Sequence, residues 1–384
     1  MALNKKTRKF LKHNISVLII ALFLVIFSLL SVTDNLSMSS QFLLEKIAIS
    51  ILLAVSLGLV VGFLGELSLG QAGFMCIGAY FGGKIASLLV ASLGNGLLTL
   101  FISILVGGLT AAISGFIIGL PALRLKGDYL AIVTLAFGEI VKTIFLNTSA
   151  ESFGGATGLS TPRYNRTYLF IYAFIFVIIM LLVIQDLIRS KHGRAITAIR
   201  DSEIASRATG INVTRYKLLV FSLSAFFAGI AGVFYSYSNF QVQCTKFDYN
   251  YSIEILVMVV LGGMGNINGS IIAGTLITFL QIKLATVLTG NLAVLQNVLY
   301  ALILILIVIY NNSPKLKSFR EKHNIKNLFK KIFKPKADPS IQKEDEAKWD
   351  RIPTKINMDE LLSMDVKVSE SVVKPDKGGK GDEW

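Results

Sequence analysis

The sequence predicts an all-α protein: a bundle of transmembrane helices with about ten crossings, one of them broken or re-entrant. Three observations carry this prediction. Of the 384 residues, 53% are hydrophobic and only 16% are charged, below the quarter that is usual in soluble domains. Apolar runs long enough to cross a bilayer as helices recur through the first 312 residues. Basic residues gather between some of these runs, as they do in the cytoplasmic loops of membrane proteins.

Nine segments are long and apolar enough to be complete spans. The first follows the basic stretch MALNKKTRKFLKH, but its 18-residue apolar run leads to no A-x-A-like cleavage site. We therefore interpret it as an uncleaved span. The predicted spans are 15–32, 42–64, 72–92, 97–120, 128–147, 168–188, 216–240, 269–288 and 293–311.

The distribution of basic residues orients these spans. The basic N-terminus 1–14, the LRLKGD turn after four crossings and the loop 189–217 after six crossings are all predicted to be cytoplasmic. The tail 313–384 begins with a second basic stretch, so an even number of crossings is required. The tenth is predicted at IEILVMVVL, 253–261, which is half a helix long. The chain then divides into the N-terminus 1–14, a membrane domain 15–312 and a cytoplasmic tail 313–384 of largely disordered composition.

Glycine interrupts the apolar pattern in two places, around 65–83 and around 262–274. Broken membrane helices occur where the freed backbone is buried in protein or lines a wet cavity, and paired breaks indicate a translocation pathway. Close packing of helices explains the glycines equally well. On the pathway interpretation, the candidate residues are Gly70, Gln71, Gly73, Gly262, Gly263, Gly265 and Asn266.

Ionisable residues inside spans are costly unless they are paired or reach water. Glu139 and Lys142 are three residues apart in LAFGEIVKTIF, so they share one face of a helix and are expected to pair. Glu139 therefore joins the candidate pathway residues. Glu66, Lys84, Glu254 and Lys283 lie nearer span ends, where snorkelling is the ordinary explanation.

The loop 189–217 predicts a short amphipathic helix, which Gly210 ends. Its apolar positions, shared between Ala195–Ile199 and Ile204–Ala208, suit docking into a groove on another protein. The chain contains no G-x-x-x-x-G-K-[ST] phosphate loop and no plausible catalytic set, so the sequence predicts neither an enzyme nor a cofactor. Most of the charges behind the net charge of +14 lie at the ends and in one loop, which favours contact with the lipid bilayer over nucleic acid.

Five stretches carry a resemblance to a known family. They are GELSLGQAGFMCIGAY, LPALRLKGDYLAIVTLAFGEI, FGGATGLS, GRAITAIRDSEIASRATGINVTRYKLLVFSLSAFFAGIAG and VVLGGMGNINGSIIAG, which tile residues 58 to 275 in order. The sequence resembles the LivM-type permeases of ABC importers for branched-chain amino acids.

The resemblance implies a second homologous permease subunit, two cytoplasmic ABC ATPase subunits and an extracytoplasmic substrate-binding protein. It also implies a multi-pass protein of the bacterial plasma membrane that transports leucine, isoleucine or valine. The loop 189–217 then becomes the coupling loop, and Arg200, Asp201, Glu203, Ala205 and Gly210 are expected to contact an ATPase. Gly210 follows Glu203 by one residue more than in the general EAA-x-x-x-G pattern.

Two other interpretations remain open. Permeases for urea or short amides share these motifs closely, and those for sugars or nucleosides share them distantly. An ion-coupled secondary transporter would also contain broken helices and buried charges, but it would need no coupling loop.

Overall fold

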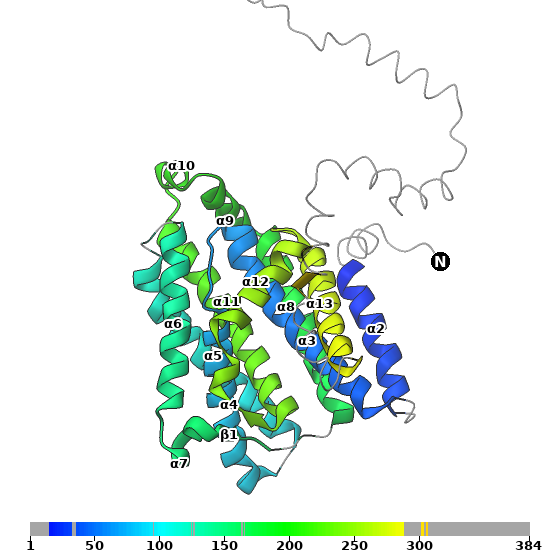
Figure 1. Cartoon of the computed structure of the whole chain (residues 1–384). Coiled ribbons are helices and arrows are strands. Elements are labelled where there is room, and N and C mark those ends of the chain that lie inside the picture. The colour runs from blue at the N-terminus through cyan, green and yellow to red at the C-terminus, as the bar shows by residue number, and fades with distance from the viewer. Residues whose placement is uncertain are drawn as a thin grey trace, which may run out of the picture. The chain divides into compact units, whose positions relative to one another are not determined.

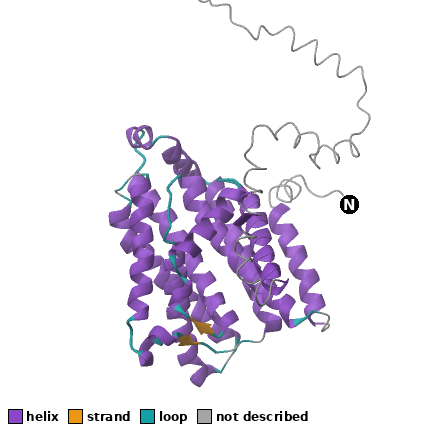
Figure 2. Ribbon diagram, viewed as in Figure 1, coloured by secondary structure: helices purple, strands orange, loops and turns teal. Residues whose placement is uncertain are grey.

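The computed structural model describes residues 15–287 except 33–35, 95, 124, 126, 163 and 165, together with 301, 302 and 305. This part of the chain is almost wholly helical (Figure 2). Its elements are α2 (Ile15–Val32), α3 (Met38–Gly58), the π-helical turn η1 (Leu59–Leu64), α4 (Gln71–Leu93), α5 (Leu97–Ala122), α6 (Asp128–Leu146), α7 (Ala150–Phe153), η2 (Gly155–Thr157), β1 (Leu159–Ser160), α8 (Arg166–Arg189), α9 (Lys191–Asp201), α10 (Glu203–Ala208), α11 (Val213–Asn239), β2 (Gln241–Val242), η3 (Cys244–Lys246), α12 (Tyr249–Gly262) and α13 (Ile267–Val287).

The predicted class, an all-α polytopic membrane bundle, is confirmed. Seven of the described helices are long and apolar enough to cross a bilayer, by length and composition. The first eight predicted spans each coincide with a helix, with bounds that differ by a few residues at most. The predicted span 293–311, the N-terminus 1–14 and the tail 313–384 lie largely or wholly outside the described residues, so the number of crossings stays a prediction.

The predicted half-helix at 253–261 corresponds to α12, which has 14 residues. At 1.5 Å per residue α12 is about 21 Å long, shorter than the roughly 30 Å hydrocarbon core of a bilayer. Before it, β2 pairs with β1 antiparallel, with Leu159 opposite Val242. The buried segment through Cys244 and Phe247 then leads to the start of α12. A short helix entered through non-helical chain thus lies where the residue pattern predicts a broken crossing.

The two ends of the bundle differ. Helices α9 and α10 lie at one end, which we call the loop end, and α7 and β1 lie at the opposite end (Figure 1). The basic loop predicted to be cytoplasmic therefore marks one end of the molecule.

Helices α4, α5 and α11 form the tightly packed centre of the bundle, and glycines set their separation. A Cβ atom added at Gly78 of α4 would lie 2.2 Å from the carbonyl oxygen of Gly229 on α11. One added at Gly232 would lie 2.1 Å from the carbonyl oxygen of Met75. Small residues let helices approach to backbone contact, which is how membrane helices gain packing energy without a hydrophobic driving force between them.

A substitution of Gly78 by alanine tests this packing. Because the added methyl group would meet backbone atoms of α11, we expect Gly78→Ala to cost about 1–3 kcal/mol of stability. Gly138→Ala is the matched control, since a Cβ there meets only Gly73 N, at 3.9 Å. Thermal unfolding of the detergent-solubilised protein measures both. Equal midpoints for the two variants would contradict the close approach of α4 and α11.

Candidate functional site

Helix α4 begins inside the bundle instead of at its surface. The segment 65–70 leaves the loop end without helical structure, and α4 starts at Gln71. The Gln71 side-chain amide donates to Ser56 Oγ at 2.7 Å, and Ser56 lies eight residues, roughly 12 Å, before the end of η1. The backbone N–H of Leu69 donates to Thr134 Oγ1 at 2.9 Å. The freed backbone N–H of Leu69 is thus satisfied by a side chain of a neighbouring helix, as a bilayer interior demands.

Helix α12 begins next to α4. Ser252, in the first turn of α12, accepts a hydrogen bond from the N–H of Ala72 at 3.2 Å. The Glu139 carboxylate of α6 accepts from the N–H of Tyr249 at 3.1 Å, while Lys142 pairs with its other oxygen at 2.6 Å. A carboxylate is favourable there because a helix N-terminus carries partial positive charge. We call the starts of α4 and α12, together with Thr134 and Glu139 of α6, the central junction.

The structure divides the predicted pathway residues into two groups. Gly70, Gln71, Gly73 and Glu139 belong to the central junction, where a Cβ on Gly73 would lie 2.9 Å from Gly138 Cα. The predicted Glu139–Lys142 pair is present. Gly262, Gly263, Gly265 and Asn266 instead form the turn between α12 and α13. Their role in transport stays a prediction for both groups.

The α12–α13 turn packs against η1 and the coupling loop. A Cβ on Gly62 of η1 would lie 2.3 Å from Gly265 N, so the two backbones touch. Arg200, the last basic residue of α9, donates from Nη1 to the Gly62 carbonyl oxygen at 3.2 Å. Its side chain also covers Gly65, whose φ of +80° requires a residue without a side chain. Both glycine-rich breaks therefore meet at the loop end, under Arg200.

A buried lysine, Lys217, links the loop 189–217 to the start of the segment 65–70 at the loop end. Lys217, in the second turn of α11, has a side chain only 3% exposed, and it forms ion pairs with both Glu66 and Glu203. The pair with Glu203 measures 3.1 Å, and Arg207 of α10 bonds the other Glu203 oxygen at 2.5 Å. The two carboxylates are themselves largely buried, and charges at such positions persist because they are paired. We call these residues, with Gly62, Gly65, Arg200 and Gly265, the loop-end junction.

The charge state of Glu203 follows from these contacts. Partial burial opposes its ionisation, but the hydrogen bonds and charges of Lys217 and Arg207 outweigh burial and lower the pKa of Glu203 below its ordinary value. Glu203 is therefore an ionised carboxylate at neutral pH. Its side chain is already occupied inside this chain, whereas the sequence predicts that it contacts an ATPase.

The loop forms two helices where the sequence predicts one. Ser202 ends α9 and caps α10, accepting from the N–H of Ala205 at 3.3 Å. The apolar side of α9 faces the bundle, with Ile196 and Ile199 at most 4% exposed. The large apolar side chain of α10, Ile204, instead points away from the bundle and is 79% exposed. Gly210 follows α10 with φ +85°, as its predicted helix-ending role requires.

The exposed surface of α10 combines the apolar side chain of Ile204 and two alanines with the charged side chain of Arg207. Asp201, Ala205 and Gly210 are exposed beside Ile204, and Arg200 is partly exposed. A large apolar side chain exposed at the tip of a loop is suited to enter a pocket on another protein.

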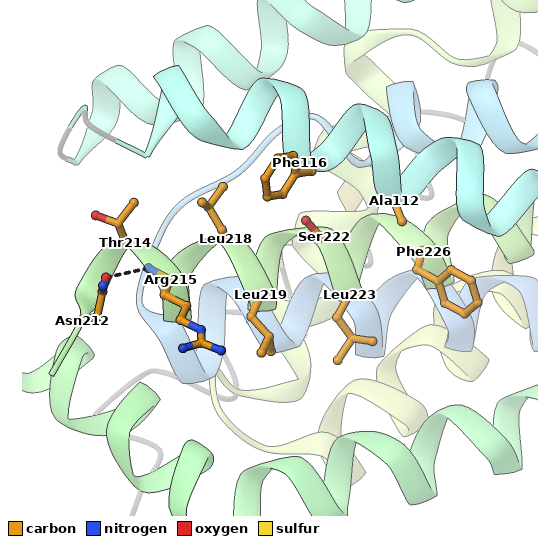
Figure 3. Close-up of a pocket in the computed structure, with 10 residues that line it drawn as sticks. All are labelled: Ala112, Phe116, Asn212, Thr214, Arg215, Leu218, Leu219, Ser222, Leu223 and Phe226. Carbon is orange, nitrogen blue, oxygen red and sulfur yellow. Dashed lines mark hydrogen bonds between the residues drawn. The ribbon is translucent and has the colours of Figure 1, made fainter.

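A cavity of about 950 Å³ lies elsewhere, on the flank between α5 and α11 (Figure 3). Three of its four polar side chains, Asn212, Thr214 and Arg215, gather at the start of α11, where Asn212 caps the helix through the Arg215 N–H. Farther along α11 the wall is mostly apolar, with Ser222 among Leu219, Leu223 and Phe226. A substrate site combines an apolar wall with convergent polar groups. This wall is instead typical of a surface that faces lipid or another helix.

Sequence reasoning missed the two charged residues that organise the loop-end junction. Glu66 is expected to snorkel at a span end, and Lys217 is one of several basic loop residues. The structure pairs them across 151 positions of sequence. The usable signal is their place next to apolar spans, since a charge at a span end on the core side requires a partner.

A helical membrane bundle in which two helices begin inside the bundle is typical of transporter-type membrane proteins. Comparison with known proteins agrees. The model of the family described as "Branched-chain amino acid transport system / permease component" matches residues 40–308. The chain belongs to this family.

Among curated proteins, the chain is 38% identical to the "High-affinity branched-chain amino acid transport system permease protein LivM" of Salmonella typhimurium. That similarity spans 60% of this chain and 60% of the relative's length. A "Probable branched-chain amino acid transport permease protein LivM" from Methanocaldococcus jannaschii is 29% identical over 58% of this chain and 67% of its own. The chain is also 25% identical to the "Ribose import permease protein RbsC" of Escherichia coli, over 71% of this chain and 85% of the relative's length. The recognition of a LivM-type permease is therefore confirmed, and the sugar permeases are more distant.

Proposed function

We propose that this chain is the membrane-spanning permease subunit of an ABC importer for branched-chain amino acids. In this proposal it sits in a bacterial plasma membrane with both termini cytoplasmic. It forms the translocation pathway with a second homologous permease, receives substrate from an extracytoplasmic binding protein and contains no ATPase site. The observation that carries the proposal is the exposed α10 tip, held by the buried Lys217 ion pairs, in a chain of this family.

Docking of an ATPase subunit is assigned to the α10 tip. Ile204 projects where it can be buried by a partner, and burying a side chain of this size contributes about 1.5–3 kcal/mol. Ala205 and Gly210 leave room around it, and Asp201 supplies a charge at the rim. Glu203 has a different role from the predicted one, because it positions α10 through Lys217.

In this proposal the loop-end junction transmits motion of the docked ATPase from α10 to the broken membrane elements. Movement of α10 pulls on Lys217 of α11 and on Glu66, which begins the re-entrant segment before α4. Arg200 carries the same movement to η1 and to the α12–α13 turn. The loop therefore contacts η1 directly and reaches the α12–α13 turn through the Gly62–Gly265 contact. Packed elements with discrete arrangements relay motion between sites.

The pathway is assigned to the side of the central junction where Glu139, Tyr249 and Asn250 are partly or fully exposed. There the start of α12 brings partial positive charge to the Glu139–Lys142 pair, which supplies charges of both signs. A zwitterionic amino acid has a matching pair of charges. The four predicted pathway residues at the α12–α13 turn, Gly262, Gly263, Gly265 and Asn266, instead transmit the motion of α10 in this proposal.

The docking assignment is tested by Ile204→Asp. We expect this variant to lose ATP-driven uptake of leucine, isoleucine and valine in proteoliposomes by about tenfold or more, because a carboxylate would be buried in the partner. Less ATPase subunit should copurify. Ile204→Leu is the matched control and should retain uptake within about twofold.

Two outcomes would contradict the proposal. One is full uptake by Ile204→Asp with the ATPase still bound. The other is uptake that persists in wild type when ATP is depleted but an ion gradient is kept, which would favour a secondary transporter. Binding proteins for urea, short amides or sugars, supplied in place of an amino-acid binding protein, test the alternative substrates.

A further inference from the structure

A second, smaller cavity opens at the loop end, outside the central junction. It has a volume of about 250 Å³ and lies between η1, the last turns of α8 and the α12–α13 turn. Its walls are Phe63, Gln185, Ile188, Arg189, Gly265, Asn266, Ile267 and Asn268. Polar side chains therefore make up half of its lining.

One side of this cavity is electropositive. Helix α13 begins at Ile267, and the Asn266 side chain accepts from the N–H of Gly269 at 3.2 Å, as a helix cap does. The first turn of a helix presents N–H groups and partial positive charge to an anion. Arg189, in the last turn of α8, adds a full positive charge to the same lining. No acidic side chain lines the cavity among the described residues.

The cavity also contains a buried hydrogen-bond acceptor, Gln185, which needs a donor from a ligand. Its side chain lines the cavity, the residue is only 6% exposed, and its Oε1 has no hydrogen-bond partner among the described residues. A buried acceptor without a donor costs about 1–3 kcal/mol, so such groups are normally satisfied. A ligand that fits here therefore carries a hydrogen-bond donor beside its negative charge.

We propose that this cavity binds a phosphoglycerol group. The phosphate ester would lie between Arg189 and the start of α13, and a glycerol hydroxyl would donate to Gln185. The volume corresponds to about eight water molecules at roughly 30 Å³ each, which is enough for a headgroup of this size.

Two sources supply this chemistry, a phosphatidylglycerol headgroup or a soluble glycerol phosphate. Basic pockets between membrane helices characteristically bind anionic lipid headgroups. The apolar side chains of Phe63, Ile188 and Ile267 border the cavity close to the ends of η1 and α8 and the start of α13. A headgroup there would also hold Gly265, which lies against Gly62 in the loop-end junction. The ligand would thereby stabilise the joint beneath the coupling loop.

The test measures binding to the full chain, purified in a mild detergent, without partner subunits. Short-chain phosphatidylglycerol is titrated by native mass spectrometry, with short-chain phosphatidylcholine as the comparison lipid. We expect phosphatidylglycerol to bind at least about tenfold more tightly, because only it offers a net anion with hydroxyl donors. Displacement by sn-glycerol 1-phosphate at similar concentration assigns the site to a soluble ester. Failure to displace assigns it to the lipid.

Variants locate the site. Arg189→Gln should weaken phosphatidylglycerol binding about tenfold and Arg189→Lys should restore most of it, while Gln185→Leu should weaken it severalfold. Lys191→Gln removes the same charge two residues away, outside the cavity, and is the matched control. Equal losses for Arg189→Gln and Lys191→Gln would overturn the proposal, as would equal binding of both lipids. Because no ATPase takes part, failure here leaves the proposed function standing.

Discussion

Lys217→Met is expected to cause a large loss of stability and of coupling together. Methionine fills nearly the same space, but it leaves the carboxylates of Glu66 and Glu203 without their shared cation. Removing one partner of a buried ion pair costs about 3–5 kcal/mol, because an uncompensated charge stays buried. Since Lys217 joins α10 to α11 and to the start of the re-entrant segment, we also expect ATP hydrolysis to continue without uptake. Thermal unfolding in detergent and ATP-driven uptake in proteoliposomes measure the two effects.

Arg207→Met is the matched control for Lys217→Met. Arg207 binds the same Glu203 carboxylate, but its side chain is 62% exposed. An exposed ion pair contributes about 0–1 kcal/mol, so this variant should unfold close to wild type. The triple variant Lys217→Met with Glu66→Gln and Glu203→Gln should regain much of the lost stability, because no buried charge then remains. Similar losses for Lys217→Met and Arg207→Met would show that the ion pairs are not what holds the loop.

The same contacts give the loop-end junction a pH dependence. The pKa of Glu203 is lower in the folded chain than its ordinary value of 4.5. A depressed carboxyl pKa stabilises the folded state above the unfolded value, and this contribution is lost as pH falls through the folded value. The stability from Glu203 is therefore complete above about pH 4.5 and decreases below it. In Lys217→Met this acid-dependent component should shrink.

The sequence predicts the helices well because lipid imposes a simple rule. A span must be apolar for about 20 residues, so α2, α5 and α6 begin at the predicted residues 15, 97 and 128. The half-helix at α12 can also be predicted from the sequence, because the basic loops require an even number of crossings. The contacts of α12 cannot be predicted in this way, since the hydrogen bond from Tyr249 to Glu139 joins residues 110 positions apart.

The functional residues are harder to predict because segments of similar composition take different positions in the structure. Both glycine-rich segments read alike, yet Gly70 and Gly73 pack at the central junction and Gly265 packs under Arg200. The coupling loop shows the same ambiguity. Ile199 and Ile204 continue one apolar pattern, but Ser202 breaks the helix between them and turns Ile199 inward and Ile204 outward. Only the path of the backbone decides which apolar residue meets a partner.

Gly62→Ala is expected to separate the two broken elements at the point where the coupling loop holds them. The added methyl group would lie 2.3 Å from Gly265 N and 2.9 Å from Gly265 Cα, and neither backbone atom can rotate away. Either η1 or the α12–α13 turn must move, which costs about 1–3 kcal/mol. The Gly62 carbonyl would then move relative to Arg200. We expect uptake per ATP hydrolysed to fall severalfold, with less effect on ATP hydrolysis itself.

Gly58→Ala separates this effect from helix propensity. Gly58 lies one turn earlier, where an added Cβ would make ordinary contacts, 3.5 Å from Ser270 Oγ and 3.9 Å from Val259 Cγ1. Alanine favours a helix over glycine by up to about 1 kcal/mol, so Gly58→Ala should be neutral or stabilising and should transport normally. If transmission runs through the Gly62–Gly265 contact, the two alanines differ although they are four residues apart on one helix. If both variants transport alike, α9 and α10 must act on the pathway through Lys217 alone.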